Sequence, residues 1–329
     1  MLERDAVKLP RRNFLHLAAG AAALPAVSHF AWAQAYPTRP VHIIVGYPAG
    51  NAPDIITRFT SQWLSERLGQ QFIVENRPGA GSNIATEAVV NAPADGYTLL
   101  MAVPTNVINA TLYANLKFNF IRDIAPVASI ANAPFVMVVT QSFPGKTVPE
   151  LIAYAKANPG KINMASPGNG TSPHIFGELF KMMAGVDLVH VPYRGSYMPD
   201  LLGGEVQVAF SPTPLLIEYI RTGKLRALAV TTAKRVEALP DVPTLGEFVR
   251  GYEAIGWYGI CVPKNTPTEV VNTLNEATNV ALAEPKFKAQ LADLGVEPMP
   301  MAPAEFAKFI ADETEKWARV IRTANIKAD

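Results

Sequence analysis

The 329-residue chain contains a single cysteine, Cys261, and this scarcity excludes several classes of site. One thiol can form neither an intrachain disulfide framework nor a cysteine-based metal site. Cys261 lies in the apolar run at residues 257–262. We therefore expect a buried structural thiol rather than a nucleophile.

A strong charge of either sign is also absent. The chain has 29 basic and 28 acidic residues, of which residues 1–33 hold four and two, so 25 and 26 remain without that segment. This balance does not suggest nucleic acid or a membrane surface as a partner. Hydrophobic residues make up 49% and charged residues 17%, which is typical of a packed globular protein, and the length suffices for two domains.

The common catalytic and metal-binding motifs are missing as well. The sequence has no Gly-x-Ser-x-Gly elbow, no phosphate-binding P-loop and no His-Glu-x-x-His motif. We therefore expect no metal and no cofactor. The alternative is an enzyme in which Ser172 is the nucleophile and His174 the base, but no third orienting group is evident. We predict that the protein is not an enzyme.

Residues 1–33 are typical of an export signal. Arg11 and Arg12 precede Phe14-Leu15, and an alanine-rich run follows, which resembles a twin-arginine signal peptide. The run is only weakly hydrophobic, which disfavours its alternative, a permanent membrane anchor. We predict cleavage near Ala33 and a periplasmic location.

The remainder alternates short apolar strands with helices, a pattern that favours mostly parallel sheets flanked by helices. We expect an α/β fold with two lobes and a ligand in the cleft between them, beyond the carboxyl ends of strands. The predicted first lobe is discontinuous and comprises residues 36–131 and 257–329. The predicted second lobe comprises residues 132–256.

One stretch, residues 41–58, combines a strand (41–45), a glycine-containing loop (46–53) and a helix that opens at Asp54. The first turn of a helix has unpaired N–H groups and a partial positive charge, and Gly50 lets the backbone approach a ligand. The stretch is therefore typical of an anion site. Asp54 either holds the loop by accepting its N–H groups or is an ordinary acidic residue in a first helical turn.

A second stretch repeats this organisation, with a strand at 161–166, a loop at 167–173 and a helix from His174. Two such loops facing one another could hold a small carboxylate through backbone N–H groups and the hydroxyls of Thr171 and Ser172. The alternative is a pair of ordinary strand-to-helix turns. Tyr47 and Trp257 either form flat walls for the ligand or pack at the hinge between lobes.

Further motifs extend over essentially the whole chain after residue 35. They are YPxRPV at 36–41, VENRPGAG at 74–81, DGYTLL at 95–100, ANPGK at 157–161, GNGTSxH at 168–174, VPYRG at 191–195, DLLGG at 200–204, LRALAVT at 225–231 and LPDVPT at 239–244. Together they resemble the Bug-type solute receptors, the periplasmic substrate-binding proteins of tripartite tricarboxylate transporters.

The resemblance implies a type II-like two-lobed periplasmic binding protein that closes on a small carboxylate and delivers it to membrane permease subunits. We expect a monomer with no nucleic-acid partner. A ligand-sensing module for a signalling partner is an alternative that keeps the same fold. We predict ligand contacts from Tyr47, Pro48, Ala49, Gly50, Asn51, Asp54, Thr105, Asn106, Gly168, Asn169, Gly170, Thr171, Ser172, Arg194, Ser211 and Trp257.

Two positions depart from the family pattern. Asn51 brings a side chain to a loop position that is usually glycine, where it alters the pocket or adds a donor. Ser211 follows the strand that ends at Phe210, where many relatives carry an acidic residue. The loss of that carboxylate makes an ammonium-bearing ligand less favoured.

Overall fold

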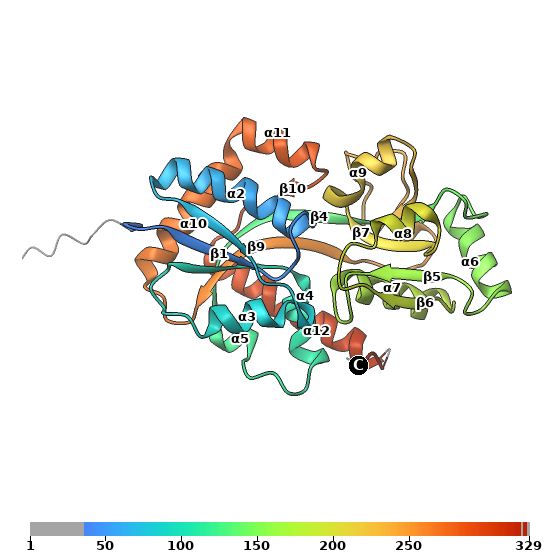
Figure 1. Ribbon diagram of the computed structural model, residues 1–329, viewed down its shortest axis with the longest axis horizontal. Helices are drawn as coiled ribbons and strands as arrows, with labels where there is room; N and C mark the ends of the chain where they lie inside the picture. The colour runs from blue at the N-terminus through green and yellow to red at the C-terminus, as the bar shows by residue number, and fades with distance from the viewer. Residues whose placement is uncertain (1–35, 324, 328–329) are drawn as a thin grey trace, which may run out of the picture. The chain divides into compact units, whose positions relative to one another are not determined.

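The computed structural model describes residues 36–323 and 325–327 (Figure 1). The predicted signal peptide and its cleavage site lie outside the described residues. From Tyr36 onward the chain forms one structural unit.

Three parallel strands begin the sheet, with β1 between β2 and β3. The predicted strand at 41–45 is confirmed as β1. The elements of this part are β1 (Val41–Val45), α2 (Ala52–Leu68), β2 (Phe72–Asn76), η1 (Ala80–Ser82), α3 (Asn83–Val90), β3 (Thr98–Ala102), α4 (Pro104–Leu112) and α5 (Phe120–Asp123).

Two long antiparallel strands, β4 (Ile124–Thr140) and β9 (Ile255–Pro263), connect this part to the rest. β9 also pairs with β3, while the C-terminal half of β4 pairs with β7 and β8. The strand order is β2-β1-β3-β9-β4-β7-β5-β6, with β8 and β10 pairing with β4. The chain therefore passes between the two parts at β4 and again at β9, which agrees with a two-lobed design; the exact lobe boundaries stay a prediction.

The second part again has parallel strands, since β5 lies between β6 and β7. The α/β fold is thus confirmed, with a sheet that is mixed because β4 and β9 run antiparallel to their neighbours. The elements here are α6 (Val148–Ala157), β5 (Asn163–Ser166), α7 (Ser172–Ala184), β6 (Val189–Pro192), α8 (Met198–Gly203), β7 (Val208–Pro212), α9 (Thr213–Arg221), β8 (Leu225–Val230) and η2 (Leu245–Glu247).

The chain after β9 is mainly helical: α10 (Thr268–Ala283), α11 (Pro285–Asp293), β10 (Glu297–Pro298) and α12 (Pro303–Thr323). Figure 1 shows α2, α10 and α11 on one side of the sheet and α3, α4 and α12 on the other. Within residues 36–323 and 325–327, no helix combines the length and the apolar character needed to cross a membrane.

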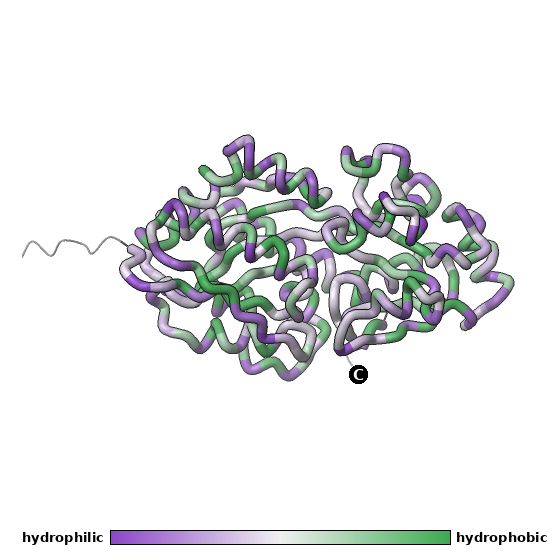
Figure 2. The backbone as a smooth tube through the Cα atoms, turned by 45° about the horizontal axis from the view of Figure 1, so that its top comes forward, coloured by the Kyte–Doolittle hydropathy of each residue, from purple (hydrophilic) through white to green (hydrophobic). Residues whose placement is uncertain are grey.

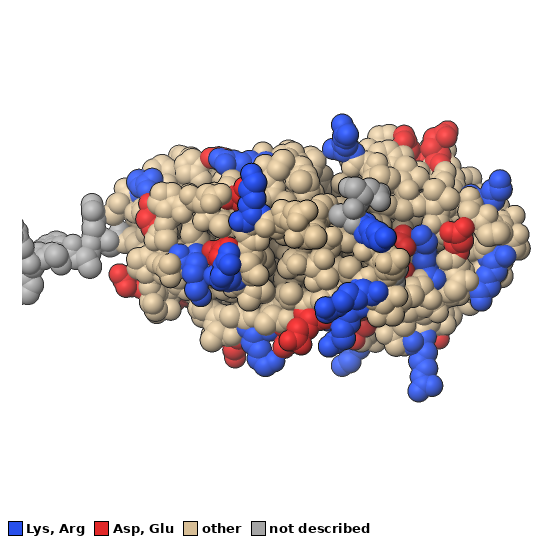
Figure 3. Space-filling view, turned by 90° about the horizontal axis from the view of Figure 1, so that it is seen from below, with Lys and Arg blue, Asp and Glu red and all other residues tan. Residues whose placement is uncertain are grey.

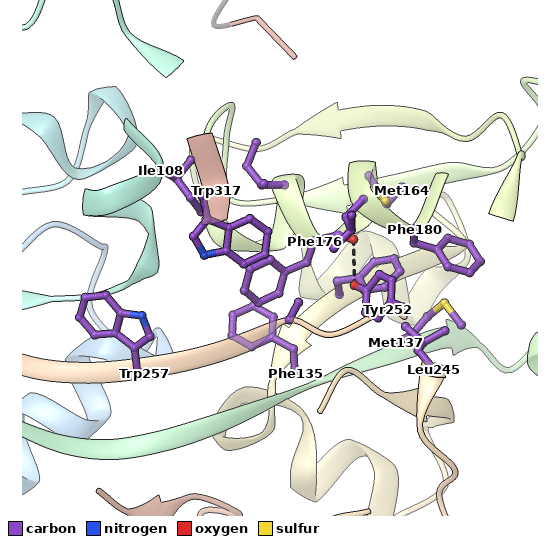
Figure 4. Close-up of a cluster of buried hydrophobic side chains, with 14 of the residues drawn as sticks. Ile108, Phe135, Met137, Met164, Phe176, Phe180, Leu245, Tyr252, Trp257 and Trp317 are labelled. Carbon is purple, nitrogen blue, oxygen red and sulfur yellow. Dashed lines mark hydrogen bonds between the residues drawn. The ribbon is translucent and has the colours of Figure 1, made fainter. Parts of the chain in front are cut away.

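Aromatic side chains of α12 pack against α7 of the second part of the fold and against the connecting strand β9. Trp317 stacks on Phe176 of α7, with ring centroids 4.9 Å apart (Figure 4). Trp257 of β9 packs edge to face against Phe306 and Phe309 of α12, with centroids 5.7 Å and 5.6 Å away. Burial of such rings is a large favourable term, so α12 is part of the core rather than an appendage.

Burial follows the hydropathy of the chain. Figure 2 shows hydrophobic backbone concentrated on the inner strands and hydrophilic backbone mainly on outer helices and loops. Cys261 on β9 is fully buried, and burial raises the pKa of its thiol, so the expected structural thiol is confirmed. On the face in Figure 3, acidic and basic side chains are interspersed, in keeping with the balanced composition.

Candidate functional site

Four helices begin around one narrow cavity, here called the first cavity, which holds about 440 Å³ of empty space including space open to solvent. Residues at or beside the starts of α2, α4, α7 and α9 contribute to its wall, together with β9. The lining residues are Tyr47, Asn51, Ala52, Pro53, Val103, Pro104, Phe135, Pro167, Ser172, Pro173, Tyr197, Pro212, Leu215, Gly256, Trp257 and Tyr258.

Each of the four helices carries a proline in its first two positions: Pro53, Pro104, Pro173 and Pro214. Proline fits there because an N–H at that position has no partner within the helix. The aligned peptide dipoles place a partial positive charge at each helix start. Helix starts therefore contribute partial positive charge at the first cavity, and none of its lining residues, all within the described chain, carries a charge of its own.

The loop at residues 46–53, here called the first loop, is held by Asp54, which is buried. Its carboxylate accepts the Gly50 N–H at 2.9 Å, Asn76 Nδ2 at 2.9 Å and Arg58 Nε at 3.0 Å. The hypothesis that Asp54 fixes the loop is confirmed. Burial raises the pKa of this carboxyl, but the hydrogen bonds outweigh burial and the pKa is lowered, so Asp54 is an anion at neutral pH. The predicted start of α2 at Asp54 is wrong: the helix begins at Ala52, because a proline in its first turn needs no N–H partner.

The loop at residues 167–173, here called the second loop, is held by hydrogen bonds to side chains of Ser166, Thr171 and His174. Ser166 Oγ accepts the Gly168 N–H at 3.1 Å, and Thr171 Oγ1 donates to the Gly168 carbonyl at 2.7 Å. The Gly170 N–H donates to Nδ1 of His174 at 3.1 Å. The amides of Gly168 and Gly170 therefore already have partners within the protein.

His174 is a neutral histidine that supports the loop. Its ring stacks on that of His190, with centroids 3.8 Å apart and planes 10° apart. Burial, followed by the neighbouring charges of His190 and Lys181, lowers the pKa of His174 to about 3. The hydroxyl of Ser172 bonds to Thr105 instead, and in the described part of the chain no hydrogen bond joins it to His174.

Thr105 connects the first loop, α4 and α7. Its Oγ1 lies 2.6 Å from the Tyr47 hydroxyl and 3.0 Å from Ser172 Oγ. The same oxygen accepts the Ser172 N–H at 3.0 Å. Three residues that the sequence placed in separate segments thus meet in one hydrogen-bonded group beside the first cavity.

The predicted ligand-binding residues divide into three groups. Tyr47, Asn51, Ser172 and Trp257 line the first cavity. A second cavity of about 1170 Å³, which shares Tyr47 and Pro167 with the first, is lined by Pro48, Gly168, Asn169, Thr171 and Arg194 among others. The remaining predicted residues line neither: Ala49, Gly50, Asp54, Thr105, Asn106, Gly170 and Ser211.

Two residues of the last group support their neighbours. Asn106 Oδ1 accepts the Val103 N–H at 2.8 Å, at the start of α4. Ser211 Oγ is hydrogen bonded to the hydroxyl of Tyr197, which lines the first cavity. Ser211 therefore lies behind a wall residue rather than in the wall.

Several aromatic and apolar residues of the wall were not among the predicted ligand contacts: Phe135, Tyr197, Pro212, Leu215 and Tyr258. Pro212 and Tyr258 directly follow the predicted residues Ser211 and Trp257 in the chain. Their position next to predicted contacts could therefore have indicated them. For Tyr197, which lies at the start of α8, no local pattern indicated a site.

A family model described as tripartite tricarboxylate transporter family receptor matches residues 56–326. This chain belongs to that receptor family. The predicted resemblance is thereby confirmed, and it extends over most of the described residues.

Individual relatives agree with this assignment. The receptor is 34% identical over 302 residues to BugT of Bordetella pertussis, covering 90% of this chain and 92% of the relative. It superimposes on a protein of R. palustris solved with adipate with a TM-score of 0.86 at 35% identity, covering 89% and 99% of the two chains. The periplasmic binding protein BugD gives a TM-score of 0.85 at 32% identity, with 89% and 100% covered.

Proposed function

We propose that this receptor captures a small carboxylate between its two lobes and delivers it to the membrane subunits of a tripartite tricarboxylate-type transporter. The observation that carries the proposal is the convergence of α2, α4, α7 and α9 on the first cavity. A helix start stabilises an anion by about 0.3–1 kcal/mol when exposed and up to about 2 kcal/mol when partly buried. Four of them can hold a carboxylate without an arginine.

The wall also contains polar side chains that can orient a carboxylate. Ser172 and Asn51 line the first cavity, and Ser172 lies at the start of α7. Asn51, the departure from the family pattern, donates one Nδ2 hydrogen to the Pro48 carbonyl at 3.3 Å, and the second hydrogen of the same amide can donate to a ligand. These groups are neutral, and neutral donors combined with helix starts favour an anion over an uncharged ligand.

The two strands that cross between the parts support closure around the ligand. We place the lobes at residues 36–131 with 257–329, and at 132–256, with β4 and β9 as the hinge. The group formed by Tyr47, Thr105 and Ser172 joins the two lobes in the closed form. The receptor works as a periplasmic monomer after cleavage near Ala33.

Binding without chemistry is part of the proposal. Nδ1 of His174 is occupied by Gly170, and its low pKa keeps the ring uncharged. The family to which the chain belongs is described as a receptor family, which supports binding without turnover. The bound acid should therefore leave the protein unchanged.

A thermal-shift screen of the purified protein tests the proposal. The panel contains benzoate, pyridine-3-carboxylate, adipate, malate, citrate and glutamate, with benzamide and adipamide as uncharged controls. An acid at about 100 times its dissociation constant should stabilise the protein by about 2.7 kcal/mol, while its amide gives no shift. Shifts by amides alone would refute carboxylate recognition, and conversion of a bound acid, seen by mass spectrometry, would refute a receptor role.

A further inference from the structure

The wall of the first cavity combines two polar side chains with a larger set of aromatic and proline side chains, here called the apolar region. The polar side chains are those of Ser172 and Asn51. The apolar region is formed by five aromatic rings and five prolines among the described residues: Tyr47, Phe135, Tyr197, Trp257 and Tyr258, with Pro53, Pro104, Pro167, Pro173 and Pro212.

Two of the aromatic hydroxyls are already engaged. The Tyr47 hydroxyl lies 2.6 Å from Thr105 Oγ1, and the Tyr197 hydroxyl bonds to Ser211 Oγ. Both hydroxyls are deeply buried, and burial raises the pKa of each to about 12, so neither becomes an anion in the physiological range. These residues therefore offer the ligand mainly ring surface.

The composition of this wall limits the charges that a ligand can bring into the first cavity. An ionised group buried without a partner is strongly disfavoured. A second carboxylate on the ligand finds no cationic side chain in the wall, and an ammonium group finds no anionic one.

Two neutral donors remain in the apolar region: the hydroxyl of Tyr258, which has no hydrogen-bond partner among the described residues, and the indole N–H of Trp257. Trp257 is fully buried and lines the first cavity, and its Nε1–H has no hydrogen-bond partner within residues 36–323 and 325–327. A buried N–H without a partner is costly and rare. A hydrogen-bond acceptor on the body of the ligand would satisfy it.

We propose that the ligand is an aromatic monocarboxylate whose ring carries one hydrogen-bond acceptor, and that Trp257 Nε1 recognises that acceptor. The inference rests on the proposed function, because the carboxylate is held at the helix starts. The ring lies in the narrow apolar region against Phe135 and Tyr197, where flat aromatic surfaces pack well. Diacids and amino acids are poor ligands because their second charge has no partner in the wall.

Calorimetric titration of the purified protein tests this, with benzoate, pyridine-3-carboxylate, 3-hydroxybenzoate, adipate and glutamate as probes. We expect at least one of the two acids with a ring acceptor to bind about tenfold more tightly than benzoate, the difference that one hydrogen bond provides. Adipate and glutamate should bind more weakly than every aromatic acid.

Two variants separate recognition by Trp257 from packing. In Trp257→Phe the ring packing against Phe306 is largely kept, while the N–H is lost, so the tenfold preference should disappear and benzoate binding should persist. The matched control is Trp317→Phe, which removes the indole N–H that donates to Glu313 at 2.9 Å in the same core, away from the first cavity. This control should lower thermal stability and keep the preference. Circular dichroism confirms that both variants are folded.

Several outcomes would overturn the inference. Tighter binding of adipate or glutamate than of any aromatic acid would overturn it. If adipate bound most tightly and Arg194→Gln lost that binding, the second carboxylate would lie in the second cavity. A preference that survives in Trp257→Phe would also do so. Neither outcome contradicts the proposed function, whereas failure of every acid to bind would contradict both.

Discussion

Oγ1 of Thr105 lies 3.0 Å from Oγ of Ser172 and 3.0 Å from its amide nitrogen, although 67 residues separate the two positions in the chain. Thr105 is in the first turn of α4 and Ser172 begins α7. One hydroxyl therefore ties together two of the four helix starts that surround the first cavity, and the tie exists only while these helices are close.

Replacement of Thr105 by valine should weaken closure, because the Ser172 N–H and the Tyr47 hydroxyl both lose a partner. We expect the radius of gyration from small-angle X-ray scattering to rise, and carboxylate affinity to fall about threefold to tenfold. The control is Thr273→Val, whose hydroxyl donates to Glu269 within α10. An unchanged scattering curve for Thr105→Val would show that this contact does not stabilise the closed form.

Replacement of Asp54 by asparagine should loosen the first loop. The carboxylate of Asp54 holds Gly50, Asn76 and Arg58, and hydrogen bonds to a charged group contribute about 1.5–3 kcal/mol. We expect a lower free energy of unfolding in urea and weaker ligand binding. Asp312→Asn, at an exposed ion pair with Lys308, should change stability by less than about 1 kcal/mol. Equal effects of the two substitutions would contradict the role given to Asp54.

Replacement of Gly170 by alanine should obstruct closure. A Cβ atom there would lie 2.6 Å from Leu112 Cδ2 and 3.0 Å from Asn109 Oδ1, both on α4, and φ is +76°. Crowding of this kind costs about 1–3 kcal/mol, so ligand affinity should fall about tenfold or more. Gly185→Ala is the matched control, since φ is +63° there but no atom is near. It should lower stability by about 1 kcal/mol and leave the affinity unchanged. Equal affinities for Gly170→Ala and the native protein would show that closure does not require the close approach of the second loop to α4.

The pH dependence of stability should report on His174. Its pKa is about 3 in the folded protein against 6.5 when unfolded, so the unfolded state binds more protons between these values. His174 should therefore reduce stability by about 2 kcal/mol as the pH falls from about 7 to about 5. Urea denaturation of His174→Asn, which keeps an acceptor near the Gly170 N–H, should lack this component. His190, Lys181 and Glu178 surround the ring and remain in both proteins. Identical pH profiles would show that His174 is not buried in its neutral form.

Local chemistry explains what the sequence could predict. The strand at 41–45, the loop after it and the loop-holding role of Asp54 depend on residues close together in the chain, and they follow from glycine, proline and helix-start preferences. The start of α2 was misplaced by two residues because Pro53 serves in the first turn as well as in a loop.

The features that the sequence could not predict depend on contacts between residues far apart in the chain. The meeting of Thr105 with Ser172 depends on how β4 and β9 bring the two parts together, and no local pattern encodes it. Tyr197 reaches the wall of the first cavity from α8 through packing alone. Ser211 was predicted as a contact because the strand was expected to end at Phe210, but Ser211 lies within β7 and its hydroxyl bonds to Tyr197.

The most direct test of the central claim is the dissociation constant of an acid compared with that of its own amide. Calorimetric titrations of benzoate against benzamide, and of adipate against adipamide, hold the body of the ligand constant and remove only the charge. If uncharged walls and four helix starts recognise an anion, the better acid of the panel binds and its amide binds at least about 100-fold more weakly, a difference of about 2.7 kcal/mol. Equal affinity of the acid and the amide would contradict carboxylate recognition by this receptor.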